Sequence, residues 1–358
     1  MADPNTRPLK RARIATDGPA DSQSNPSGSS ISTSSSNLHR HPEIWYDDGN
    51  LVLVARETAF RIYRGLIAGQ STVFSDLFAS STSSPDETFE GCPVIHVSDS
   101  PHDLVLLLRV LLPQSRIHYH TTSANPTRTF DELSAVIRLA HKYNVSQVLE
   151  QALSSLHEFG FATSFATYSN PLPGSPLALD PWLNIAVVNL ANLTDTPSLL
   201  PLALFRCAYL GGELFDGWTH EDGTVEHLSE ADLRRCVDGR TTLTHEYTTF
   251  LMALFDPSTG PVCARHATCS ANLRRMQHNA VCSKELALQH DALKDWVEVV
   301  REIENSGKVC RSCAGGMADR AKKGQKKIFE RLPEIFGVTV EGWGTEQVAT
   351  AVVAGEGQ

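Results

Sequence analysis

Residues 51–63 carry two kinds of hydrophobic pattern in close succession. Residues 51–55 are Leu-Val-Leu-Val-Ala, a continuous apolar run typical of a buried strand. Residues 58–63 alternate polar and apolar side chains, which is typical of a half-buried strand. Because only residues 56–57 separate the two runs, we expect them to pair as a hairpin.

Farther along the chain, apolar residues recur at intervals of three and four, the spacing of an amphipathic helix. Ser100 followed by Pro101 is typical of a helix start. The further elements predicted are two short helices within 65–78, a strand at 94–97, and helices over 101–111, 133–143 and 145–156. Three strands among several short helices predict an α+β domain at residues 43–158.

The second half of the chain shows helical spacing throughout. A Pro- and Ser-rich connection over 160–181 precedes it, and residues 180–337 are predicted to form an all-α domain. Ser229 with Asp232 three residues later is typical of a capped helix start. Residues 338–358 are expected to form a flexible C-terminal tail.

Residues 1–41 have a different composition and are expected to be a disordered tail. Nine of the fifteen residues from Ser22 to Ser36 are Ser, so the stretch has little to bury against its ordering entropy. The tail also contains Lys10-Arg11-Ala12-Arg13, which fits a short nuclear-import pattern or, alternatively, a solubilising basic arm. An intracellular location, in the nucleus or the cytoplasm, is therefore expected.

Charge and hydropathy narrow the function classes. The 358 residues carry a formal charge of −10, and because residues 1–41 are +2, the remainder is −12. Such an acidic remainder is repelled by phosphate backbones, so nucleic-acid binding is not expected as the main function. The basic run from Arg320 to Arg331 fits a solvated helix face, or a contact with phosphate or an acidic partner. The most apolar run, Leu104 to Leu112, is interrupted by Arg109 and predicts no membrane segment.

Four cysteines have the spacing of a metal site. Cys263 and Cys269 form one pair, and Cys310 and Cys313 form a C-x2-C pair about 40 residues later. Four soft thiolates suit structural zinc, so the sequence predicts a zinc site at these positions. His266 or Cys282 could replace one ligand, and the alternative is that all four are buried reduced cysteines. The remaining three cysteines stand singly among apolar residues and are expected in the core: Cys92, Cys207 and Cys236.

Several motifs resemble a known family. The run from Phe60 to Phe78, FRIYRGLIAGQSTVFSDLF, resembles the F-x-x-H-r-x-x-L-a-x-x-S-x-x-F signature of BTB/POZ domains, and Leu139-Ala140-His141-Lys142-Tyr143 is similar to the family's L-A-x-K-Y helix. The opening WYDDGN at residues 45–50 and the late RLPEIFG at 331–337 are similar to segments of fungal (basidiomycete-type) BTB proteins. Tyr63 and Ile67 depart from the usual His and Leu, so no role of that His carries over.

The resemblance implies a BTB/POZ fold and a protein–protein interaction module, a scaffold or regulator, not an enzyme. Association with a second copy is one expectation, and a monomer whose apolar patch is covered by residues 160–340 is the alternative. A substrate adaptor for a cullin-type ubiquitin ligase is a second hypothesis, although the loop at residues 113–119 lacks the family's apolar-x-Glu motif. A transcription-related nuclear factor is a third. We find no spaced catalytic motif in the sequence.

Overall fold

The computed structural model describes residues 38–81, 87–112, 129–158, 160–170, 181–220, 223–282 and 291–345. The described residues from His39 onward belong to one compact unit. The basic motif at residues 10–13, the loop at 113–128 and the chain beyond residue 345 lie outside the described residues, and so do the predictions made for them.

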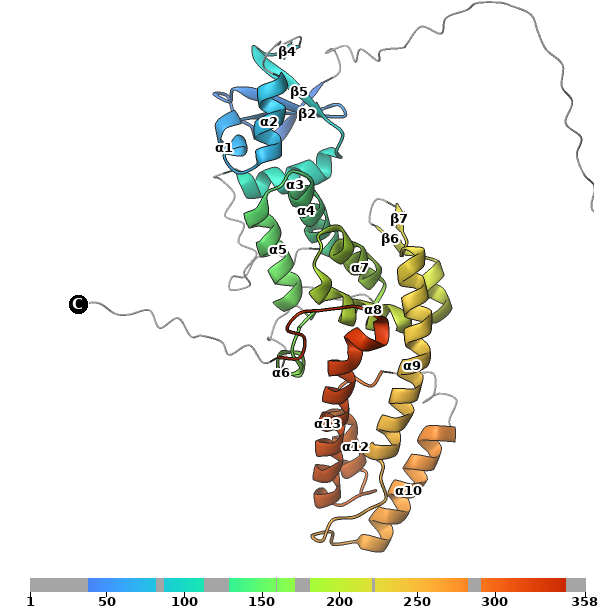
Figure 1. Ribbon diagram of the computed structural model, residues 1–358. Helices are drawn as coiled ribbons and strands as arrows, with labels where there is room; N and C mark the ends of the chain where they lie inside the picture. The colour runs from blue at the N-terminus through green and yellow to red at the C-terminus, as the bar shows by residue number, and fades with distance from the viewer. Residues whose placement is uncertain are drawn as a thin grey trace, which may run out of the picture. The chain divides into compact units, whose positions relative to one another are not determined.

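The N-terminal region is built on a mixed five-stranded, curled sheet (Figure 1). Its order is β1-β3-β2-β5-β4. Strand β2 runs antiparallel to β3 and parallel to β5, while β1 runs parallel to β3. The strands are β1 (His39–Trp45), β2 (Leu51–Ala55), β3 (Thr58–Ile62), β4 (Thr88–Phe89) and β5 (Cys92–Val97).

The hydrophobic runs become the central strands, as predicted. All five side chains of β2 are fully buried, because this strand has neighbours on both edges and helices against the sheet. The turn to β3 places Arg56 at a φ of 53°. The sequence missed β4 and β1, and β1 begins inside the segment expected to be tail. Only Ile44 of β1 is buried, so this strand is held by backbone pairing that leaves no hydrophobic pattern.

Five helices complete the N-terminal region, and all five confirm the predicted ones. Ser100 caps the third of them, with its side chain accepting a hydrogen bond from the backbone N–H of Asp103. Phe74 stacks on Tyr143 with ring centroids 4.0 Å apart, which fixes the second helix against the fourth. The helices are α1 (Arg64–Ala68), α2 (Thr72–Ser81), α3 (Pro101–Leu111), α4 (Phe130–Lys142) and α5 (Ser146–Glu158).

The rest of the chain is mainly helical. Ser229 caps the longest central helix through the N–H of Asp232, as the sequence predicts. In Figure 1, α9 and α13 lie side by side along most of their length. The α-helices are α6 (Phe165–Tyr168), α7 (Asn184–Leu193), α8 (Leu200–Tyr209), α9 (Glu230–Leu254), α10 (His266–Cys282), α12 (Trp296–Asn305) and α13 (Arg311–Phe336). None of the helices in the described residues is long and apolar enough to cross a membrane.

Two parts of the C-terminal region differ from the prediction. A short hairpin of β6 (Trp218–Thr219) and β7 (Val225–Glu226) interrupts the helices, so the all-α expectation was wrong in this detail. Residues 338–345 are not a free tail, because Trp343 stacks on Phe329 at 4.8 Å and donates a hydrogen bond to its backbone oxygen. Neither segment has an apolar period, since each is held by single contacts with helices far away in sequence.

The β6–β7 hairpin joins the two regions. Trp218 packs edge-on against Phe130 of α4, with ring centroids 5.5 Å apart. Glu226 accepts hydrogen bonds from Arg138 of α4, Asn189 of α7 and the imidazole of His220. The stretches expected to be separate domains are therefore in direct contact at this hairpin.

Candidate metal centre

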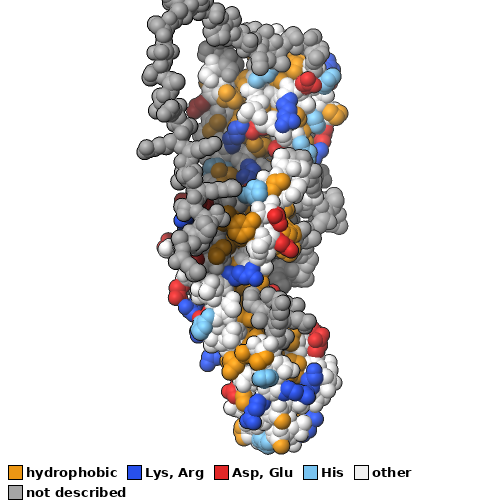
Figure 2. Space-filling view, turned by 90° about the vertical axis from the view of Figure 1, so that its right-hand side faces the viewer, with side chains coloured by type: hydrophobic (Ala, Val, Ile, Leu, Met, Phe, Trp, Pro, Cys, Tyr) orange, Lys and Arg blue, Asp and Glu red, His pale blue; other side chains and the backbone are white. Residues whose placement is uncertain are grey.

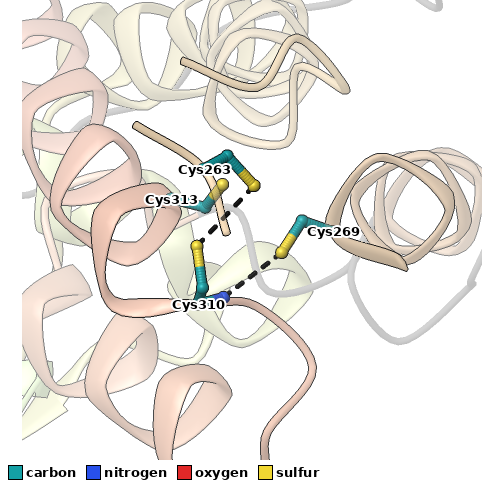
Figure 3. A group of neighbouring side chains, drawn as sticks. All are labelled: Cys263, Cys269, Cys310 and Cys313. Atoms are coloured by element: carbon teal, nitrogen blue, oxygen red, sulfur yellow. Dashed lines mark hydrogen bonds between the residues drawn. The ribbon is translucent and has the colours of Figure 1, made fainter. Parts of the chain in front are cut away.

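The four cysteines predicted to bind zinc come together in the C-terminal region. Their Sγ atoms all lie within 4.8 Å of one another. Figure 3 shows the four side chains pointing toward a common point. The cluster joins three segments that are distant along the chain, and the prediction that these four residues are neighbours is confirmed.

The backbone explains why each thiol points inward on the first side of the cluster. Cys263 lies in a turn in which its N–H donates to the oxygen of Gly260. Cys269 is in the first turn of α10, and its N–H donates to the oxygen of Arg265. The five residues between the two cysteines thus bend the chain from a turn into a helix, and this brings both sulfurs to one side.

The C-x2-C pair forms the other side. Cys310 is the N-cap of α13, with extended backbone angles, and Cys313 is in the first turn of that helix. The side-chain amide of Asn272 in α10 donates to the oxygen of Lys308 at 2.7 Å, which holds the turn against α10. A C-x2-C turn at a helix start is the local geometry that presents two sulfurs to one ion.

The sulfur spacing fits a tetrahedral ion. With Zn–S bonds of about 2.3 Å, the sulfurs of a tetrahedral centre are about 3.8 Å apart. The sulfurs of Cys310 and Cys263 are 3.7 Å apart. A disulfide needs an S–S distance of about 2.05 Å, and all four cysteines carry free thiols.

Hydrogen bonds and burial act on the thiols in opposite directions. Backbone N–H donation from Cys313, and then from Ala264, lowers the pKa of Cys310 to about 6. Burial and the neighbouring thiols of Cys263 and Cys310 raise the pKa of Cys313. Burial also raises the pKa of Cys269, although the backbone N–H of Cys310 donates to its sulfur at 3.3 Å. A bound cation would favour the thiolate at every position, because its charge is the largest in such a site.

The two alternative ligands lie outside the cluster. His266 is exposed, and its Nδ1 is 2.8 Å from the hydroxyl of Thr259. Cys282 is exposed at the far end of α10, with its sulfur 3.8 Å from Nδ1 of His278. The ligand set is therefore all sulfur. The other three cysteines are buried in the core as predicted: Cys92, Cys207 and Cys236.

The sequence missed the second set of contacts around the sulfurs. The backbone N–H of Cys310 donates to the sulfur of Cys269, and the amide of Asn272 donates to the oxygen of Lys308. Both hydrogen bonds require α10 to lie beside the turn at residues 308–310. Such donors orient and tune a metal's ligands. No pattern in the sequence marks them, because a backbone donor carries no residue signature and Asn272 is 36 residues away from Lys308 along the chain.

Comparison of the chain with protein-family models and with curated proteins gives no match in either case.

Proposed function

We propose that this protein is an interaction module of the BTB/POZ type, whose helical C-terminal region is stapled by structural zinc. The N-terminal region would bind other polypeptides, including a second copy of the chain. The zinc centre would hold α10 and α13 together.

The order of elements supports the first part. A hairpin, two short helices, a strand and then three helices follow one another in the N-terminal region, in the order that the quoted motifs imply for a BTB domain. The residues of the resemblance also occupy packing positions. Phe60, Ile67 and Phe74 are fully buried, which fits a role of these positions in packing the fold.

A surface pocket is the observation that carries the binding function. It has a volume of about 310 Å³ and lies where β1, β3, α3 and α4 meet. Val105 and Leu106 form its apolar part, and Arg109 and Glu132 supply opposite charges. A pocket that combines apolar side chains with opposite charges suits an anchoring side chain of a protein partner.

Filling the pocket tests this function. Val105→Arg would place a long charged side chain in it, and Val148→Arg, at a valine of α5 that is equally buried but does not line the pocket, is the matched control. Light scattering and affinity purification from the native cell with mass spectrometry would compare both variants with the wild type. We expect Val105→Arg alone to lose partners or self-association, with its folding checked by circular dichroism. An unchanged partner set and a strict monomer for all three proteins would contradict the proposal.

The clustering of four cysteine sulfurs is the observation that supports the proposed structural zinc. Zinc would use Cys263, Cys269, Cys310 and Cys313 and would act as a cross-link, not as a catalyst, because four protein ligands leave no open position. Metal analysis of the purified protein should find about one zinc per chain. Cys263→Ser should lose it and Cys282→Ser should keep it. Freely alkylated thiols in a folded, metal-free protein would contradict this assignment.

A further inference from the structure

Positive charge is concentrated around the cysteine centre. Two segments, residues 261–282 and 306–327, contain ten Lys and Arg but only one acidic residue, Asp319. They include α10, the turn at residues 308–310 and most of α13. Their formal charge is +9, whereas the whole chain is −10, so the remaining residues carry −19. In Figure 2, Lys and Arg side chains gather at the lower end of the molecule. A thiolate-bound zinc ion would add −2 and leave these segments at +7.

Most of these cations are exposed and lack ion pairs within the described residues. The structure gives no carboxylate partner among those residues to the following exposed side chains: Arg265, Arg274, Lys308, Arg311, Lys322, Lys323 and Lys327. Lys326 pairs only with Glu330 one turn along the same helix, at 3.8 Å. Elsewhere in the described chain, exposed cations such as Arg40, Lys142 and Arg234 have carboxylate partners. Unpaired like charges repel one another, so an anionic partner would relieve this repulsion.

Four exposed lysines of α13 form a surface that we call the basic face. Lys322 and Lys326 are one turn apart on α13, and Lys323 and Lys327 form the next row. Arg311 precedes Lys322 by about three helical turns on the same side of α13, and the sulfur cluster brings Cys263 to the start of that helix.

Other side chains limit what the basic face can bind. Glu298 and Glu302 of α12 are exposed, and α12 packs on α13, so acidic residues border the face. Val262 is 78% exposed beside Cys263 and offers an apolar contact. Among the described residues of α10 and α13, no Phe, Tyr or Trp ring is exposed for base stacking, and only the smaller rings of His266 and His278 are.

We propose that the basic face is a docking surface for an acidic polypeptide segment that also carries an apolar side chain. Glutamate and aspartate side chains would pair with the two lysine rows, and the apolar side chain would contact Val262. A nucleic acid fits less well. Duplex DNA carries a charge about every 1.7 Å along its axis and would extend beyond the face to the remaining chain, which carries −19. This surface is separate from the pocket of the N-terminal region and does not depend on it.

Fluorescence anisotropy with the full-length protein tests the proposal. The probe is a labelled peptide of about 12 residues, mostly Glu with two Leu, and the competitor is a DNA duplex of about 15 base pairs. Lys322→Glu with Lys326→Glu reverses two charges on the face. Arg56→Glu with Arg234→Glu makes the same net change at exposed positions elsewhere. We expect the first pair to weaken peptide binding at least about 10-fold at low salt, and the second pair to change it less than about 2-fold.

Three results would overturn the proposal. One is peptide binding that both double variants weaken equally, since this would reflect net charge alone. Another is duplex binding that is tighter than peptide binding and is lost in the Lys322→Glu, Lys326→Glu variant, which would make the face a nucleic-acid surface. The last is no peptide binding by the wild type near 50 mM salt, where exposed charges are screened little. Circular dichroism of both double variants would confirm that they fold.

Discussion

The N-terminal sheet and the cysteine-containing end of the helical region are held together by different forces. Every side chain of β2 is fully buried, and apolar helices pack around that strand. Helix α10, by contrast, has 17 residues but only three buried ones, Cys269, Leu273 and Ala280. Burying a large apolar side chain stabilises by about 1.5–3 kcal/mol, so α10 has little hydrophobic attachment of its own. Where apolar burial is scarce, thiolates and a metal ion can supply the missing stabilisation.

Removal of the proposed zinc ion should reveal this difference most strongly. Structural zinc in small sites contributes about 10–16 kcal/mol of apparent binding free energy at neutral pH. A strong chelator should therefore detach α10 from the turn at residues 308–310, while β2 stays paired in the sheet. Hydrogen exchange followed by mass spectrometry should show faster exchange over residues 263–282 and none of that change over 51–55. Equal loss of protection in both regions would mean that the centre stabilises the whole unit.

Truncating a side chain in the N-terminal core should have the opposite result: it should lower the stability of the fold and leave zinc binding unchanged. Phe74 is fully buried and stacks on Tyr143, so Phe74→Ala should cost about 3–5 kcal/mol through lost burial and a cavity. Chemical denaturation would measure the loss, and zinc content should stay unchanged in the folded protein. Loss of zinc in the folded variant would contradict the idea that the two regions are stabilised separately.

Gly239 allows α9 to pack closely against α13, and a substitution there should destabilise the protein less than Phe74→Ala. A Cβ at Gly239 would clash with the ring of Phe336, so Gly239→Ala should destabilise by about 1–3 kcal/mol through overpacking. Gly315→Ala is the matched control on α13, because nothing lies within 4 Å of its Cβ. The control should be stabilised by up to about 1 kcal/mol, since alanine is the better helix former. Thermal denaturation of both variants would test this contrast, and equal effects would refute it.

Glu226 of the β6–β7 hairpin should make a smaller contribution to the free energy of unfolding, and this contribution should depend on pH. Burial alone would raise the pKa of Glu226, but Arg138, Asn189 and His220 outweigh it and hold the pKa below its usual value. A carboxyl with a lowered pKa in the folded state stabilises above its unfolded pKa, and that stabilisation is lost as pH falls through the folded value. Glu226→Gln should therefore cost about 1–2 kcal/mol at pH 7 and progressively less below about pH 4. Urea denaturation across that range would measure it, and a pH-independent loss would contradict the assignment.

Much of this architecture was predictable from local patterns. Each hydrophobic pattern predicts one element, because the buried side chains of that element are the pattern itself. This holds for the 51–55 run, the alternation at 58–62 and the helical spacing farther along the chain. Ser100 and Ser229 mark helix starts for the same reason, since a cap is a contact within four residues. The C-x2-C spacing at residues 310–313 likewise predicts a metal ligand pair from neighbouring residues alone.

Only the tertiary structure decided the rest. It selected Cys263 and Cys269 over His266 and Cys282, and it brought them to Cys310 across some 40 residues. It also formed β1 by pairing with β3, fixed the β6–β7 hairpin against α4, and folded Trp343 onto Phe329. These features arise from single long-range contacts and backbone hydrogen bonds. Such interactions leave no period in the sequence, because each depends on where a distant segment happens to pack.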